Sequence, residues 1–193
     1  MEQDELLRFA VGALERAGAQ YYVTGGQAAA LWGEPRTTID IDIVAELASW
    51  RVRDFCAEFA EPDFYVDPEA AMHAVRFGGM FNIIHVPSGY KLDIIASNDT
   101  PHDGLCFDRA RRVDVGGREA AFASPEDIIL KKLEYVRDHR SDKQMRDIAA
   151  IIRVRADQLD RGYIDQWSLR LGVRDAWEFV RNAVDRAGPE GNV

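Results

Sequence analysis

The chain has 193 residues, 47% of them hydrophobic and 30% charged, and a formal net charge of −9 at pH 7. This composition excludes a disordered chain and suffices for one domain or for a domain with a small appendage. The negative charge argues against a protein that coats long nucleic acids, because such binding depends on cations that neutralise phosphates. The N-terminus lacks the pattern of a signal peptide, and no apolar run approaches the roughly 18 residues of a membrane span. We therefore expect a cytoplasmic protein that makes no contact with a membrane.

Up to residue 123 the chain has the pattern of an α/β fold. Apolar residues at helical spacing predict helices at residues 4–18, 26–32 and 49–60, and a short helix within the loop 97–111. Short apolar or alternating runs predict strands at residues 21–24, 37–44, 64–66, 80–86, 90–96 and, as a hairpin, 113–122. Pro87-Ser88-Gly89 is a turn signal that joins two of these strands.

At Ser124 the pattern changes to helices alone. Ser124 is a capping residue, Pro125 suits the first helical position, and acidic residues follow in the first turn. Helices are predicted at 125–138, 142–154, 161–171 and 174–187. We predict a core formed by residues 1–123 and a helical subdomain, residues 124–193, packed on it.

The segment TIDIDI carries the strongest chemical signal. Successive side chains of a strand point to opposite faces, so Asp40 and Asp42 should share one face. Ile39, Ile41 and Ile43 should point the other way, into a core. Two neighbouring carboxylates repel each other and are stabilised by a bound cation. This strand is therefore a candidate metal site.

Gly25-Gly26 precedes this strand and opens the predicted helix at 26–32. Backbone amides at such a glycine turn can bind phosphate groups. Asp93 lies within a later apolar strand, where an unpaired carboxylate is costly to bury. It is either a structural residue, with Lys91 as its ion-pair partner, or a third metal ligand. Three carboxylates on neighbouring strands would suit a pair of Mg²⁺ ions, with Mn²⁺ as an alternative.

The order of Gly-Gly, Asp-x-Asp and a later single Asp resembles the DNA polymerase β-type nucleotidyltransferase superfamily. More narrowly, GGQAAALWGEPRTTIDIDI, KLDII, SPEDIILKKLEYVR and SDKQMRDIAAII resemble the bacterial AbiEii/AbiGii toxin-type nucleotidyltransferases over most of residues 20–155. The resemblance implies an α/β (α+β) fold, in which a polymerase β-like nucleotidyltransferase core with a mixed sheet is followed by a C-terminal helical subdomain.

The resemblance also implies a mechanism. The enzyme would move a nucleoside monophosphate from a nucleoside triphosphate such as ATP to an acceptor hydroxyl and release pyrophosphate. Asp40 and Asp42 would hold both metal ions, while Asp93 would help to hold the ion that activates the acceptor. Gly25 and Gly26 would contact the terminal phosphates through their amides.

The resemblance adds four further candidates. Thr24 and Arg36 would contribute to nucleotide binding, although Arg36 could equally be an ordinary surface residue. Lys132 matches the lysine of the family's helical motif and would reach the nucleotide as a catalytic and nucleotide-binding residue. Asp147 matches the acidic residue of the later motif as a catalytic residue, and an ordinary helix ion pair with Lys143 is the alternative.

The resemblance points to RNA, notably the 3′ end of tRNA, as the acceptor. It also implies the toxin of a toxin–antitoxin or abortive-infection system, with a cognate antitoxin protein as partner. Two alternatives remain open. One is nucleotidylation of a small molecule such as an antibiotic, or of a protein hydroxyl. The other is a catalytically idle module that binds a nucleotide or an antitoxin, although the intact set of glycines and aspartates argues against it.

Overall fold

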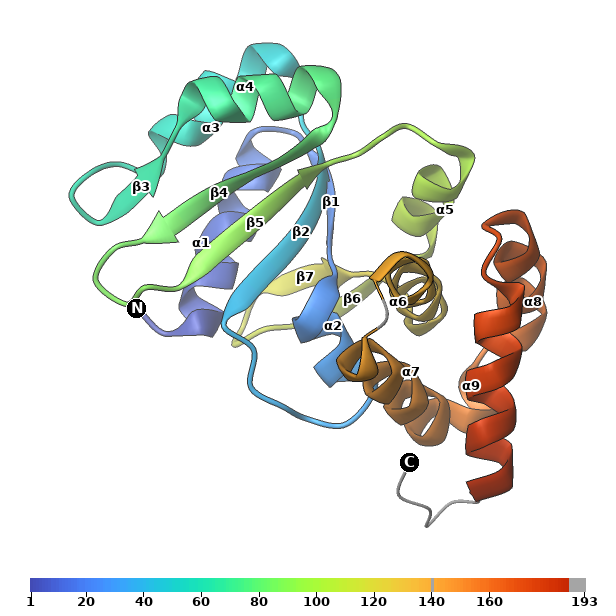
Figure 1. The fold of residues 1–193 in the computed structure, drawn as a ribbon. Coiled ribbons are helices and arrows are strands. Elements are labelled where there is room, and N and C mark those ends of the chain that lie inside the picture. Colours follow the sequence, from blue (N-terminus) through green and yellow to red (C-terminus); the bar gives the residue numbers. More distant parts are fainter. Residues whose placement is uncertain (140, 188–193) are drawn as a thin grey trace. The chain divides into compact units, whose positions relative to one another are not determined.

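The computed structural model describes residues 1–139 and 141–187 (Figure 1). The chain divides into two compact units. The first consists of Met1–Gln27 and Thr38–Ala123, and the second of Ala28–Thr37 and the chain from Ser124 onward. The segment 28–37, which was predicted to belong to the core, thus clusters with the second unit. Helix α2 (Gly25–Trp32) begins in the first unit and ends in the second.

The first unit is built on a seven-stranded sheet with the order β3-β4-β5-β2-β1-β7-β6. Its strands are β1 (Gln20–Val23), β2 (Asp40–Glu46), β3 (Phe64–Val66), β4 (Gly79–His85), β5 (Lys91–Ala96), β6 (Arg111–Asp114) and β7 (Glu119–Phe122). The pairs β2–β5 and β1–β7 are parallel, and the other neighbouring pairs are antiparallel. The sheet is therefore mixed, as predicted.

Four helices belong to the first unit: α1 (Gln3–Arg16), α3 (Val52–Ala57), α4 (Pro68–Phe77) and α5 (Pro101–Arg109). Helix α4 was not predicted. Its start has clear signals, because Asp67 caps the amides of Glu69 and Ala70 and Pro68 takes the first helical position. Its buried residues are only Ala71 and Ala74, so it lacks the large apolar side chains on which a periodicity argument depends.

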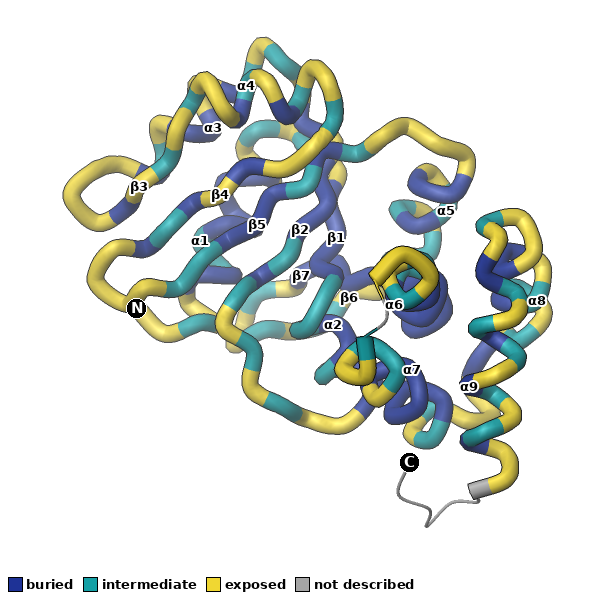
Figure 2. Tube along the Cα trace, in the orientation of Figure 1, coloured by how far each residue is buried: buried dark blue, intermediate teal, exposed yellow. Residues whose placement is uncertain are grey.

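Burial along β2 follows the predicted alternation from Asp40 to Ile43, after which Val44 and Ala45 are both buried (Figure 2). Ile41 and Ile43 are fully buried, whereas Ile39 is 68% exposed. The prediction for Ile39 was wrong because the strand begins only at Asp40, and the alternation of side chains holds only within the strand. The predicted placement of the two aspartates does not depend on Ile39.

The second unit is helical, with α6 (Pro125–His139), α7 (Asp142–Arg155), α8 (Arg161–Arg170) and α9 (Arg174–Ala187). These four helices match the predicted ones to within one or two residues. Ser124 accepts a hydrogen bond from the amide of Asp127, and Trp177, Ile128, Ile148 and Ile152 are buried in the unit's core. No helix among the described residues has both the length and the hydropathy needed to cross a bilayer.

Candidate active site

The structure brings the three predicted carboxylates together on the first unit's sheet. Strands β2 and β5 are parallel neighbours, and their register places Asp42 directly opposite Asp93 and Asp40 opposite Lys91. Directly opposite residues of a ladder share a face, so all three aspartates lie on the face opposite to Ile41 and Ile43. Residues that are far apart in sequence thus form one carboxylate-rich surface.

The glycine turn lies against this surface. Gly25 has φ +62°, and a Cβ atom at this position would lie 1.9 Å from Oδ2 of Asp42. Only glycine fits here, both because of the backbone angle and because of the close approach of the carboxylate. The amide of Thr24 donates to the backbone carbonyl of Asp42 over 2.8 Å, which fixes the turn to β2. The Thr24 amide is therefore engaged within the protein, while the turn itself adjoins the carboxylates.

Asp93 is the most buried of the three aspartates, with 7% of its surface exposed. Its Oδ1 accepts a hydrogen bond from Asn82, which lies directly opposite on β4. Sequence reasoning missed Asn82, although the Pro87-Ser88-Gly89 turn allows the hairpin register to be counted out to this pair. Lys91 Nζ lies 3.1 Å from Oδ2 of Asp93 and 3.6 Å from Oδ1 of Asp40. The ion pair considered for Lys91 is therefore present, and it lies within the carboxylate cluster.

A second cluster lies within the second unit and contains the other three predicted residues. Arg36 binds Asp147 in a bidentate manner, with Nε 2.9 Å from Oδ1 and Nη2 2.8 Å from Oδ2. Lys132 Nζ lies 2.8 Å from Oδ2 of the same carboxylate and also donates to Gln144. Asp147 thus pairs with Arg36 and Lys132, and the alternative of a simple helix pair with Lys143 does not describe its contacts.

The charges of this cluster depend on one another. Burial lowers the pKa of Lys132, and the hydrogen bond to Asp147 only partly opposes this effect. Burial also opposes ionisation of Asp147, but the hydrogen bonds from Arg36 and Lys132 outweigh it and lower the pKa of that carboxyl. Asp147 is therefore ionised at neutral pH and forms ion pairs with both Arg36 and Lys132. These contacts suit a residue that positions the two cationic side chains.

Replacing Asp147 by Asn should lower the free energy of unfolding by about 3 kcal/mol near pH 7, because Lys132 would stay buried without its anionic partner. The folded-state pKa of Asp147 lies below its ordinary value of 3.8. Its stabilising effect should therefore be complete above that pH and be lost as the pH falls through the lower folded-state pKa. Urea unfolding of both proteins at several pH values measures this difference. The exposed Asp157→Asn is the control, and equal stability of Asp147→Asn and the parent chain near pH 7 would contradict the prediction.

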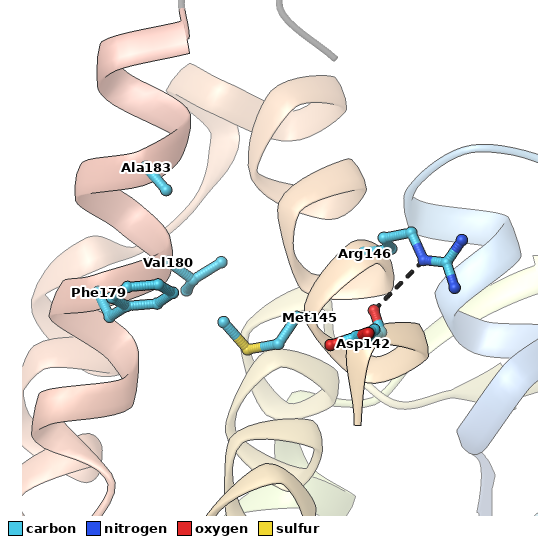
Figure 3. Close-up of a pocket in the computed structure, with 6 residues that line it drawn as sticks. All are labelled: Asp142, Met145, Arg146, Phe179, Val180 and Ala183. Atoms are coloured by element: carbon cyan, nitrogen blue, oxygen red, sulfur yellow. Dashed lines mark hydrogen bonds between the residues drawn. The ribbon is translucent and has the colours of Figure 1, made fainter. Parts of the chain in front are cut away.

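Two pockets open beside α7 in the second unit. One has a volume of about 310 Å³ and is lined by Ala29, Glu34, Pro35, Arg36, Lys143, Arg146, Asp147 and Ala150. The other has a volume of about 450 Å³ and is lined by Asp142, Met145, Arg146, Phe179, Val180 and Ala183 (Figure 3). In the second pocket α9 contributes apolar side chains, and Arg146 donates to the carbonyl of Asp142 on α7. The first pocket is the more cationic, and it contains Arg36 and Asp147.

No protein-family profile matches the chain, and no curated protein matches it in sequence. Solved structures do match it. The antibiotic-resistance factor ANT(2″)-Ia, in complex with adenylyl-2″-tobramycin, is 16% identical with a TM-score of 0.58, over 91% of this chain and 98% of that one. The lincosamide antibiotic adenylyltransferase LnuA, bound to lincomycin, is 13% identical with a TM-score of 0.50, over 78% and 96%. A candidate nucleotidyltransferase from Thermotoga maritima is 21% identical with a TM-score of 0.52, over 74% and 92%.

At sequence identities this low, the structural matches establish that the fold is shared. The chain has the polymerase β-like nucleotidyltransferase fold, with a mixed sheet followed by a helical part, and the predicted fold class is confirmed. The protein thus has the fold of the nucleotidyltransferases, and its candidate site is a carboxylate cluster beside a glycine turn.

Proposed function

We propose that this chain is a metal-dependent nucleotidyltransferase that moves a nucleoside monophosphate from a nucleoside triphosphate to an acceptor hydroxyl. The observation that carries the proposal is the placement of Asp42 and Asp93 directly opposite each other, with Asp40 on the same face and Gly25 against Asp42. A structural role alone would not require three carboxylates on one face beside a turn that only glycine can form. The fold supports the proposal independently.

The residues fit a divalent cation of the hard type. The site offers only carboxylate oxygens, which Mg²⁺ and Mn²⁺ prefer, and their mutual repulsion is relieved by positive charge. Asp40, Asp42 and Asp93 would hold the metal, which as a Lewis acid would stabilise charge on the phosphates and lower the pKa of the acceptor hydroxyl. Asn82 orients the Asp93 carboxylate through its hydrogen bond.

The remaining residues serve binding in this proposal. Amides at the start of α2, at Gly25 and Gly26, have no partner within the helix and can bind phosphate oxygens. Arg36 and Lys132 of the second unit are proposed as further nucleotide-binding residues, and Asp147 is the positioning residue that holds their side chains in place.

The proposed acceptor is RNA, with the tRNA 3′ end first, as the resemblance to AbiEii-type toxins implies. In that case an antitoxin would be the partner. A small cationic molecule is the second candidate, because ANT(2″)-Ia and LnuA share the fold and the net charge of −9 favours a cationic acceptor.

Transfer of label from each α-labelled triphosphate tests both acceptors in one experiment with Mg²⁺. Total tRNA, an aminoglycoside and a lincosamide are offered separately, and Asp40→Ala/Asp42→Ala is the control. We expect labelled tRNA that is absent with the control variant. Label on an antibiotic alone would replace RNA by the second candidate. Bound nucleotide without transfer to any acceptor would favour the idle module and contradict the proposal.

A further inference from the structure

Lys91 has an unusual place for a lysine. It lies on β5 two residues before Asp93 and directly opposite Asp40 on β2, so its side chain shares the face of all three carboxylates. Its ammonium group lies between two of them, 3.1 Å from Asp93 Oδ2 and 3.6 Å from Asp40 Oδ1. A third of the Lys91 side chain, 33%, is exposed, so the ammonium group has room to move outward.

The oxygen atoms that Lys91 contacts belong to two of the proposed metal ligands, Asp40 and Asp93. Oδ1 of Asp93 accepts a hydrogen bond from Asn82, while Lys91 Nζ lies 3.1 Å from Oδ2, so both oxygens of this carboxylate are engaged. A lysine ammonium group is positively charged at neutral pH. A positive charge already in the cluster repels a second cation and offsets the repulsion among the carboxylates.

We propose that Lys91 is a built-in counter-cation of this site. Its ammonium group pairs with Asp93 and Asp40 in the metal-free protein and moves aside when a metal binds. The inference rests on the proposed metal site. Its consequence is that a metal ion alone binds weakly. A metal that arrives with a triphosphate binds more tightly, because the phosphates give the displaced ammonium group a new anionic partner. Lys91 thereby couples metal binding to nucleotide binding.

Direct Mn²⁺ binding without nucleotide tests this inference, measured from the electron paramagnetic resonance signal of free Mn²⁺. Lys91→Met keeps an unbranched side chain that is one atom shorter and removes the charge, and this variant should bind Mn²⁺ roughly tenfold more tightly. Lys91→Arg keeps the charge and should resemble the parent chain. Lys131→Met removes the same charge from α6 and is the matched control. At low salt, Lys91→Met without metal should also melt at a lower temperature, and Mn²⁺ should raise that temperature more than in the parent chain.

Asp93→Asn separates this inference from the proposed function. If Asp93→Asn loses Mn²⁺ binding while Lys91→Met binds like the parent chain, the metal site stands and the role of Lys91 is overturned. If Lys91→Met instead weakens nucleotide binding at unchanged Mn²⁺ affinity, Lys91 is a phosphate ligand and the inference also fails. If Asp93→Asn does not alter Mn²⁺ binding, or if neither the parent chain nor Lys91→Met binds Mn²⁺, the proposed metal site itself fails, and the inference fails with it.

Discussion

Replacing Asp42 by Asn should reduce nucleotidyl transfer by at least about 10³-fold, which corresponds to about 4 kcal/mol of lost transition-state stabilisation. Asn has the shape of Asp but lacks the negative charge that holds a divalent cation. Asp42 faces Asp93 directly and lies against Gly25, so no other carboxylate in the described sheet can take its place. Steady-state transfer of labelled nucleotide to whichever acceptor proves active measures the loss.

The fold should survive this substitution. Removing one of three neighbouring charges relieves repulsion, so the melting temperature of Asp42→Asn without metal should equal or exceed that of the parent chain. The exposed Asp63→Asn on the same unit is the matched control and should keep its activity. Transfer by Asp42→Asn at the parental rate would remove the carboxylate cluster from the mechanism. A lost fold, seen by circular dichroism, would show that Asp42 is structural.

Replacing Gly25 by Ala should have the second-largest effect. The new Cβ would lie 1.9 Å from Oδ2 of Asp42, so either the turn or the carboxylate must move. The residue also has φ +62°, which costs about 1–2 kcal/mol for an L-residue with a side chain. We expect a loss of about 3 kcal/mol in the free energy of unfolding together with at least a hundredfold loss of transfer.

Gly18→Ala separates the two causes. Gly18 has φ +69°, close to that of Gly25, but its added Cβ meets no atom within 4 Å. It should lose only about 1 kcal/mol of stability and keep its activity. Urea unfolding and transfer assays on both variants give the comparison. Equal effects at the two positions would mean that backbone strain, and not contact with Asp42, explains the need for glycine.

The sequence by itself determined the features that arise within a few consecutive residues. Side-chain alternation places Asp40 and Asp42 on one face, because this property belongs to any strand regardless of its partners. The four C-terminal helices were predicted for the same local reason, since their apolar residues recur at helical spacing. Helix α4 was missed because its buried residues are alanines, and Ile39 was misplaced because a strand boundary is set by pairing with other strands.

Only the tertiary structure decided which of these features meet. The parallel register of β2 and β5 places Asp42 opposite Asp93 and brings Lys91 beside Asp40, and no local pattern specifies how separate strands align. Arg36 and Asp147 are 111 residues apart in sequence, yet they form a bidentate pair in one compact unit. Contacts of this kind depend on packing between distant segments, whose cost in chain entropy is recovered only when the whole unit folds.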